Sequence, residues 1–166
     1  MKKSNIVLIG MPSSGKSTIG KQLADELKMA FIDTDEVLRQ KVGAELRDVV
    51  KERGLEMFLK LQEEAVLGIQ VENHVIATGG SAVYSKASME HLRNNGVIIY
   101  LEYDYEDIEK RVTPDRRFAR SGGQSLLDLF NERTPLYKEN ADIIVNGSGK
   151  SVEKIVKDIK IKLESK

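Results

Sequence analysis

A glycine-rich loop between a predicted strand and a predicted helix limits the folds that this chain can adopt more than any other part of the sequence. Residues 10–18 read Gly-Met-Pro-Ser-Ser-Gly-Lys-Ser-Thr, which fits the pattern G-x-x-x-x-G-K-[ST] at every fixed position. Residues 6–9 before the loop are all apolar, and residues 16–27 after it carry apolar side chains at helical spacing. A glycine-rich turn could join a strand to a helix by chance, but the matching context favours a phosphate-binding loop.

The chemistry of such a loop is specific. Glycines allow the backbone N–H groups to point inward, and the N-terminal end of the following helix adds positive charge. Lys16 is placed to reach the β- and γ-phosphates of a nucleotide, and the Ser17 hydroxyl is placed to ligate Mg²⁺. We therefore expect ATP and Mg²⁺ as cofactors. The expected nucleotide contacts within the loop are Gly10, Ser13, Ser14, Gly15, Lys16, Ser17 and Thr18.

Strand and helix patterns alternate along the rest of the chain. The expected strands are residues 6–9, 30–32, 75–77, 97–101 and 142–145. The expected helices are residues 16–27, a helix-rich stretch to about residue 71 with breaks near Gly43 and Gly54, and then 85–94, 105–112, 125–137 and 151–163. Strands separated by helices of this length pair in parallel through right-handed crossovers. We predict a single α/β domain over residues 1–166, with three α/β/α layers, a five-stranded parallel sheet and a mobile lid at about residues 113–124.

Composition narrows the class of ligand. The chain has no cysteine, and 26 basic residues balance 26 acidic ones for a formal net charge of zero. This balance provides no basic surface for nucleic acid or an anionic membrane, and no apolar stretch approaches the roughly 20 residues that span a bilayer. We expect a cytoplasmic monomer that acts on a small molecule and binds neither nucleic acid nor membrane.

Two further loops follow predicted strands, where parallel sheets bind their ligands. Asp33 and Asp35 come after residues 30–32, so one carboxylate can face a metal and the other a hydroxyl. Alternatively, Asp35 is a helix cap and Asp33 only favours the helix dipole. Gly79 and Gly80 come after residues 75–77, and their backbone N–H groups could bind a substrate or phosphate oxygen. A tight connection without a ligand is the alternative for this turn.

These three elements, in this order, resemble the shikimate kinase family of P-loop enzymes, which are similar to nucleoside monophosphate kinases. The resemblance covers almost the whole chain. It includes the phosphate loop, a D-[ST]-D signature at residues 33–35, the double-glycine turn, the strand at residues 97–102, and residues 132–137, which resemble the family's R-x-P-L-Y motif.

The resemblance implies ATP-dependent phosphorylation of shikimate to shikimate 3-phosphate. It implies that Asp33 lies near Mg²⁺ and that Asp35 orients or deprotonates the substrate hydroxyl. Gly79 and Gly80 would contact the substrate through their backbone, and Arg133 would bind its carboxylate.

The resemblance also assigns several arginines to the nucleotide. Arg111 would lie against the adenine, and the lid arginines Arg116, Arg117 or Arg120 would reach the phosphates. We expect Arg117 to act in catalysis beside Lys16 and Asp35. The alternative for the lid arginines is a solvated basic loop, although the neighbouring Ser-Gly-Gly at residues 121–123 favours a closing lid.

The departures from the family lie at the acceptor end. The family pattern F-R-x-x-E reads Phe-Leu-Lys-Leu-Gln here, so Leu59 and Gln62 replace an arginine and a glutamate. Leucine cannot make the two-pronged carboxylate contact of a guanidinium. Ser81 replaces the third glycine of the turn, and the lid lacks the family's R-P-L sequence.

Three functional hypotheses follow. The first is a shikimate kinase, including one with an altered acceptor. The second is another kinase of the same fold, acting on a sugar acid such as gluconate or on a nucleotide. The third is a nucleotide-binding module without catalysis. Asp35 and Arg133 argue against the third hypothesis, whereas Leu59 and Gln62 favour a changed acceptor or a loss of activity.

Overall fold

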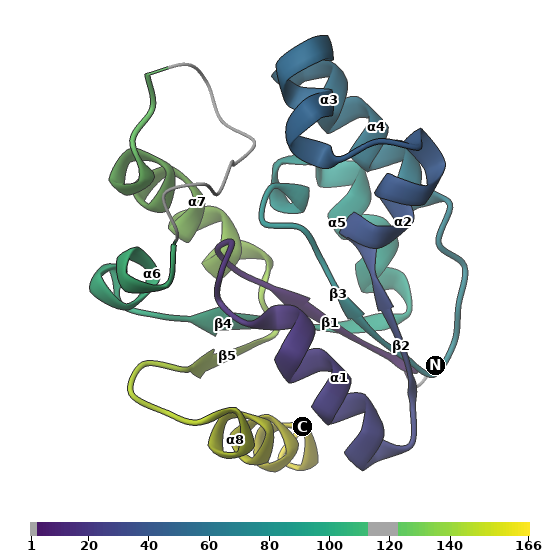
Figure 1. Ribbon diagram of the computed structural model, residues 1–166. Helices are drawn as coiled ribbons and strands as arrows, with labels where there is room; N and C mark the ends of the chain where they lie inside the picture. Colours follow the sequence, from purple (N-terminus) through teal and green to yellow (C-terminus); the bar gives the residue numbers. More distant parts are fainter. Residues whose placement is uncertain (1–2, 113–122) are drawn as a thin grey trace.

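The computed structural model describes residues 3–112 and 123–166, which form three layers around a parallel sheet (Figure 1). Within these residues the sheet has five strands in the order β2-β3-β1-β4-β5, and each neighbouring pair is parallel. The strands are β1 (Asn5–Ile9), β2 (Ala30–Asp33), β3 (His74–Ala77), β4 (Gly96–Glu102) and β5 (Ile143–Asn146). The predicted α/β fold and its five parallel strands are confirmed.

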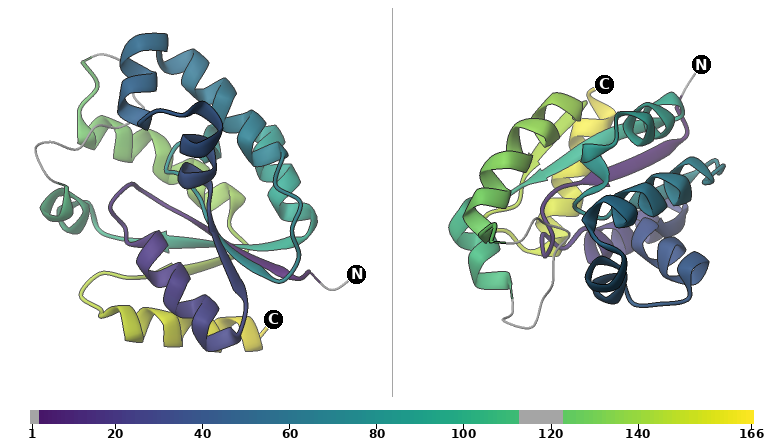
Figure 2. Two further views of the ribbon diagram at one scale, coloured as in Figure 1. Left: turned by 45° about the vertical axis from the view of Figure 1, so that its right-hand side comes forward. Right: turned by 90° about the horizontal axis from the view of Figure 1, so that it is seen from above.

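Helices cover both faces of the sheet. The helices are α1 (Lys16–Leu27), α2 (Thr34–Val42), α3 (Leu46–Arg53), α4 (Leu55–Leu67), α5 (Lys86–Asn94), α6 (Tyr105–Arg111), α7 (Leu126–Asn140) and α8 (Val152–Glu164), with a 3₁₀ turn η1 (Ala82–Tyr84). Helices α1 and α8 lie together on one face, while α4, α5 and α7 lie on the other (Figures 1 and 2). The described residues include no helix long and apolar enough to cross a membrane.

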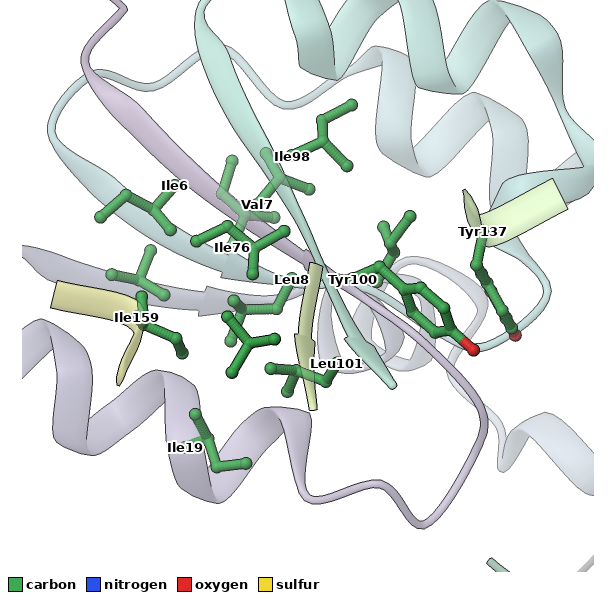
Figure 3. Close-up of a cluster of buried hydrophobic side chains, with 14 of the residues drawn as sticks. Ile6, Val7, Leu8, Ile19, Ile76, Ile98, Tyr100, Leu101, Tyr137 and Ile159 are labelled. Atoms are coloured by element: carbon green, nitrogen blue, oxygen red, sulfur yellow. The ribbon is translucent and has the colours of Figure 1, made fainter. Parts of the chain in front are cut away.

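Strand β1 is buried along its whole length because helices pack on both of its faces. Its side chains join Ile19 of α1, Ile76 of β3 and Ile159 of α8 in the main core (Figure 3). Tyr100 and Tyr137 stack at the end of this core with ring centroids 5.1 Å apart. Burial raises the pKa of Tyr100 to about 12 and also raises the pKa of Tyr137, so both phenols remain neutral at ordinary pH.

A second, smaller core joins α2, α3 and α4 beside the sheet. Its buried members are Leu38, Val49, Phe58 and Ala65. These three helices therefore form a compact unit next to the edge strand β2. The unit matters for function because it forms one wall of the cleft described below.

Some element boundaries differ from the sequence expectation. Helix α4 ends at Leu67 rather than near residue 71. Its C-cap is Gly68, a residue of low helix propensity, which makes a last helical hydrogen bond from its N–H to the carbonyl of Glu64. Helix α7 continues to Asn140, past the expected end at residue 137, with Pro135 inside it. The predicted lid at residues 113–124 lies largely outside the described residues, which resume at Gly123.

Candidate active site

A cleft with a volume of about 1090 Å³ lies at the carboxyl ends of the central strands, where the fold predicts a ligand. The phosphate loop forms one side and helix α3 the other, while the second glycine turn and Arg133 form the floor. Most of the predicted site residues line this cleft, namely Ser13, Ser14, Gly15, Lys16, Ser17, Thr18, Asp33, Asp35, Gly79, Gly80 and Arg133. The structure therefore brings the separate motifs of the sequence to one place.

The phosphate loop has the backbone of an anion-binding turn. Ser13 and Gly15 both adopt left-handed conformations, with φ of 67° and 83°, and Gly15 is the residue before the first turn of α1. The Lys16 ammonium donates to the carbonyl oxygens of Gly10 at 2.7 Å and Met11 at 2.8 Å, and only 7% of this residue is exposed. The lysine is thus held over the loop, where it can contact an entering phosphate.

Ser17 and Asp33 form a pair suited to a hard cation. The Ser17 hydroxyl donates to Oδ2 of Asp33 at 2.5 Å, while Oδ1 of Asp33 accepts from the backbone N–H of Asp35 at 2.9 Å. Asp33 is therefore the cap of α2, and the alternative that Asp35 is the cap is wrong. This cap fixes one carboxylate oxygen and turns the other toward Ser17.

A hydroxyl and a carboxylate oxygen are the ligands that Mg²⁺ prefers beside phosphate oxygens and water. The part of the chain that the structure describes contains no cluster of three or more histidine, cysteine, aspartate or glutamate side chains arranged for a metal. The donor set at Ser17 and Asp33 therefore fits a Mg²⁺ ion that arrives with a nucleotide, rather than a dedicated protein cage.

The second glycine turn lies directly against Asp35. A Cβ atom on Gly79 would overlap with the carboxylate of Asp35 and would come within 2.9 Å of the amide nitrogen of Gln62. The Gly79 N–H donates to the Thr34 hydroxyl at 3.0 Å, and Tyr137 donates its hydroxyl to the Gly80 carbonyl at 2.6 Å. A side chain at residue 79 would therefore displace the carboxylate of Asp35.

Arg133 is a buried cation at the floor of the cleft. It projects from α7, and 1% of it is exposed. Its Nε donates to the Tyr84 hydroxyl at 3.1 Å, and its guanidinium lies 5.1 Å from the centre of the Tyr84 ring. A guanidinium held by an aromatic ring keeps donors in a fixed fork, which suits the recognition of a carboxylate.

The acceptor side carries a hydrogen-bonded neutral pair, Gln62 and Ser81, where the family pattern has a glutamate and a glycine. Ser81 donates its hydroxyl to the carbonyl oxygen of Gln62 at 2.9 Å, and both residues are buried. The amide nitrogen of Gln62 is buried and makes no hydrogen bond within residues 3–112 and 123–166. Leu59, one helical turn earlier, packs half-buried against the second core.

Arg111 lies near the phosphate loop. Its guanidinium stacks 4.4 Å from the centre of the Tyr103 ring, and a nitrogen of the same guanidinium lies 3.7 Å from the place where a Cβ on Gly15 would be. Its expected contact with adenine stays a prediction. The predicted lid arginines Arg116, Arg117 and Arg120 lie outside the described residues.

Sequence reasoning missed the contribution of α3 to the cleft. Leu46, Arg47, Asp48, Val50 and Lys51 all line it. A signal was present in the sequence, because apolar residues 46 and 50 and basic residues 47 and 51 repeat at a spacing of one helical turn. The sequence alone did not indicate that this face of α3 turns toward the phosphate loop.

The fold and this site define a P-loop small-molecule kinase, a phosphotransferase that acts on a hydroxyl group. Comparison with known proteins gives the particular family, since the model of the shikimate kinase family matches residues 12–164. The shikimate kinase of Francisella tularensis subsp. novicida is 38% identical over 165 residues, covering 96% of this chain and 94% of that protein. The shikimate kinase of Paracidovorax citrulli is 36% identical over 168 residues, covering 96% and 92% of the two chains. The chain belongs to the shikimate kinase family.

Solved structures agree with this assignment. The crystal structure of shikimate kinase from Aquifex aeolicus superposes with a TM-score of 0.82 at 31% identity, covering 97% of this chain and 96% of that chain. Shikimate kinase from Acinetobacter baumannii, solved in complex with shikimate, superposes with a TM-score of 0.87 at 27% identity, covering 98% and 94%. A sugar kinase from Janibacter at 16% identity and a TM-score of 0.55 shares the fold alone.

Proposed function

We propose that this protein transfers the γ-phosphate of ATP to the 3-hydroxyl of shikimate, with Mg²⁺ as the metal. The observation that carries the proposal is the meeting of Lys16, Asp35 and Arg133 in one cleft, together with membership of the shikimate kinase family. These residues supply a cation for phosphate, a carboxylate for a hydroxyl and a cation for an acid group.

In this proposal the residues around the phosphate loop hold the nucleotide. The loop N–H groups and Lys16 bind the β- and γ-phosphates, and Arg111 lies against the adenine. Ser17 and Asp33 hold Mg²⁺, which offsets the negative charge that develops on the phosphate oxygens. Phosphoryl transfer depends mainly on positioning and charge neutralisation, and these residues provide both.

The acceptor is oriented from the opposite side. Asp35 accepts a hydrogen bond from the reacting hydroxyl, and the backbone of Gly79 and Gly80 positions the ring beside it. As the bond between the acceptor oxygen and the γ-phosphorus forms, the bond between that phosphorus and the bridging oxygen of ADP breaks. The hydroxyl proton passes to Asp35, and Arg133 holds the substrate carboxylate throughout.

We further propose that the chain is a single domain that acts as a monomer in the cytoplasm. Arg117 and Arg120 lie outside the described residues, and we propose that both contact the phosphates and that Arg117 stabilises the transferring group. Size-exclusion chromatography at catalytic concentrations tests whether the protein is a monomer. Arg117→Ala tests the role of this arginine, because it is expected to lower turnover while leaving the oligomeric state unchanged.

A second candidate function follows from Leu59 and Gln62. These residues replace the arginine and glutamate of the family pattern by an apolar side chain and an amide, and Gln62 bonds to Ser81, which lines the cleft. Such a change would also suit a kinase whose acceptor is a different sugar acid or a nucleotide. A nucleotide-binding module without catalysis would bind ATP yet transfer nothing.

One assay separates these candidates. ADP release is measured with Mg²⁺-ATP alone and then with shikimate, gluconate or a nucleoside monophosphate at matched concentrations. The proposal predicts ADP release that depends on shikimate and exceeds the basal rate many-fold. Stimulation by another compound alone would identify that compound as the acceptor. A basal rate with every compound would favour the nucleotide-binding module without catalysis.

A further inference from the structure

The acceptor end of the cleft lacks a cation on α4, although an acidic substrate brings a carboxylate there. Leu59 occupies the position at which the resemblance places an arginine, and it packs against the second core. Lys60 is exposed on α4 and is not among the described residues that line the cleft. A carboxylate that leaves water needs a hydrogen-bonded cation, because its desolvation is otherwise costly.

The cleft nevertheless carries further positive charge on α3. Among the described residues that line it, the cationic side chains are Lys16, Arg47, Lys51 and Arg133. Lys16 sits over the phosphate loop, and Arg133 is fixed on Tyr84 at the floor. Arg47 and Lys51 are therefore the cations that the wall facing the phosphate loop contributes.

The geometry of α3 places these two residues on one face. Arg47 and Lys51 are four residues apart, so their side chains project in nearly the same direction one turn apart. Leu46 and Val50 line the cleft beside them and also pack, partly buried, against the second core, whereas Val49 is fully buried in that core. The resulting surface combines apolar side chains with two cations and one carboxylate, that of Asp48, so its excess of positive charge suits an acidic acceptor.

Within the described residues, Arg47 makes only a weak ion pair and Lys51 makes none. The Nε of Arg47 lies 4.0 Å from Oδ1 of Asp48, at the limit of an ion pair, and both side chains are at least half exposed. Such a pair contributes little stability in water. Across the described ranges, no ion pair involves Lys51. Both cations can therefore turn toward a carboxylate in the cleft.

From these observations we infer that Arg47 and Lys51 of α3 bind the carboxylate of the acceptor opposite Arg133, and so replace the arginine that α4 lacks. The inference rests on the proposed function and deepens it, because it assigns the recognition of the acid group to a different helix. Arg47 supplies a planar fork that can pair with both carboxylate oxygens, and Lys51 adds a mobile point charge.

The test compares Arg47→Gln and Lys51→Gln, singly and together, with Arg53→Gln as a matched control. Arg53 lies on the same helix and carries the same charge, but it does not line the cleft. Loss of a charge-assisted hydrogen bond predicts a KM for shikimate raised about tenfold or more in each single variant. The KM for ATP is expected to stay within twofold of wild type in all variants, and Arg53→Gln is expected to match wild type throughout.

A neutral substrate shows whether the contact is with the acid group. The methyl ester of shikimate is given to the same proteins, and wild type and the α3 variants are expected to use it almost equally. The inference is overturned if the variants retain the wild-type KM for shikimate. It is also overturned if their KM values for shikimate and for its methyl ester rise by the same factor. A wild-type protein that phosphorylates no shikimate would contradict the proposed function itself, and this inference with it.

Discussion

The two ends of the cleft are built in different ways. The phosphate end consists of one continuous loop and the start of α1, and its contacts are largely made by the backbone. The acceptor end is assembled from α3, α4, the second glycine turn and α7, which come from separate parts of the chain, and most of its expected contacts are made by side chains. The loop depends on backbone conformations that favour glycine, such as the φ of 83° at Gly15, whereas a site made of side chains can be rebuilt one residue at a time. This difference accords with a loop that fits its pattern fully while Leu59, Gln62 and Ser81 depart from the family.

The largest expected effect lies at the phosphate end. Lys16→Met removes the cation that the loop holds over the phosphates, and turnover is expected to fall about 10³-fold. The ammonium contacts the carbonyls of Gly10 and Met11, so a thermal unfolding curve must accompany the assay to show that the loop still folds. Turnover within tenfold of wild type in a folded variant would contradict the assigned role.

At the acceptor end the strongest effect is expected from Gly79→Ala. The added methyl group would displace the Asp35 carboxylate, and a small misplacement of such a group costs about 10²-fold in turnover. Gly68→Ala is the matched control, since a Cβ there meets its nearest neighbour at 3.5 Å and should be accommodated. Equal turnover in the two variants would show that the position of Asp35 does not limit the reaction.

Gln62, the α4 member of the neutral pair with Ser81, gives the next effect. Gln62→Glu places a carboxylate in a buried position near Asp35 without a cation at residue 59, and the free energy of unfolding is expected to fall by about 2 kcal/mol. Burial raises the pKa of the new carboxyl, so the loss is present at neutral pH and shrinks as the pH falls and the group is protonated. Chemical denaturation at pH 7 and pH 4 measures both values.

A second substitution, at residue 59, is expected to compensate for Gln62→Glu. Leu59→Arg combined with Gln62→Glu restores an opposite-charge pair at a spacing of three residues on one helix. We expect the double variant to recover much of the stability lost by Gln62→Glu. A double variant less stable than both single variants would show that residues 59 and 62 do not form such a pair in this chain.

The smallest effect is expected from Ser81→Ala. This change removes the hydroxyl that holds the Gln62 carbonyl oxygen, and it costs about 1 kcal/mol of unfolding free energy. The KM for the acceptor is expected to change only slightly, because the backbone of the turn is retained. A thermal melt identical to that of wild type would show that this buried hydrogen bond adds no net stability.

The sequence allowed the phosphate end to be predicted closely because its chemistry is local. The loop pattern, the strand before it and the helix after it are all read within residues 5–27, and the structure agrees with each. Ser17 and Asp33 were both expected near Mg²⁺, Ser17 from the loop pattern and Asp33 from the family resemblance, and the structure pairs their side chains. The sequence could not show whether Asp33 or Asp35 is the cap of α2, because both are aspartates and aspartate suits that position.

The acceptor end was harder to predict because it depends on tertiary packing. The direction in which α3 turns Arg47 and Lys51 is set by Val49, which packs against Phe58 and Leu38 in the second core. No local pattern in the sequence predicts this contact of Val49. The absence of an arginine at residue 59 was visible in the sequence, but the two cations that α3 contributes to the cleft became visible only in the fold.

The central claim is that this cleft transfers phosphate to shikimate. The most direct measurement is a ³¹P NMR spectrum of the protein incubated with Mg²⁺-ATP and shikimate, beside a sample without shikimate. We expect a phosphomonoester signal that grows together with ADP and only when shikimate is present. A spectrum that shows unchanged ATP, or only inorganic phosphate and ADP in both samples, would contradict it.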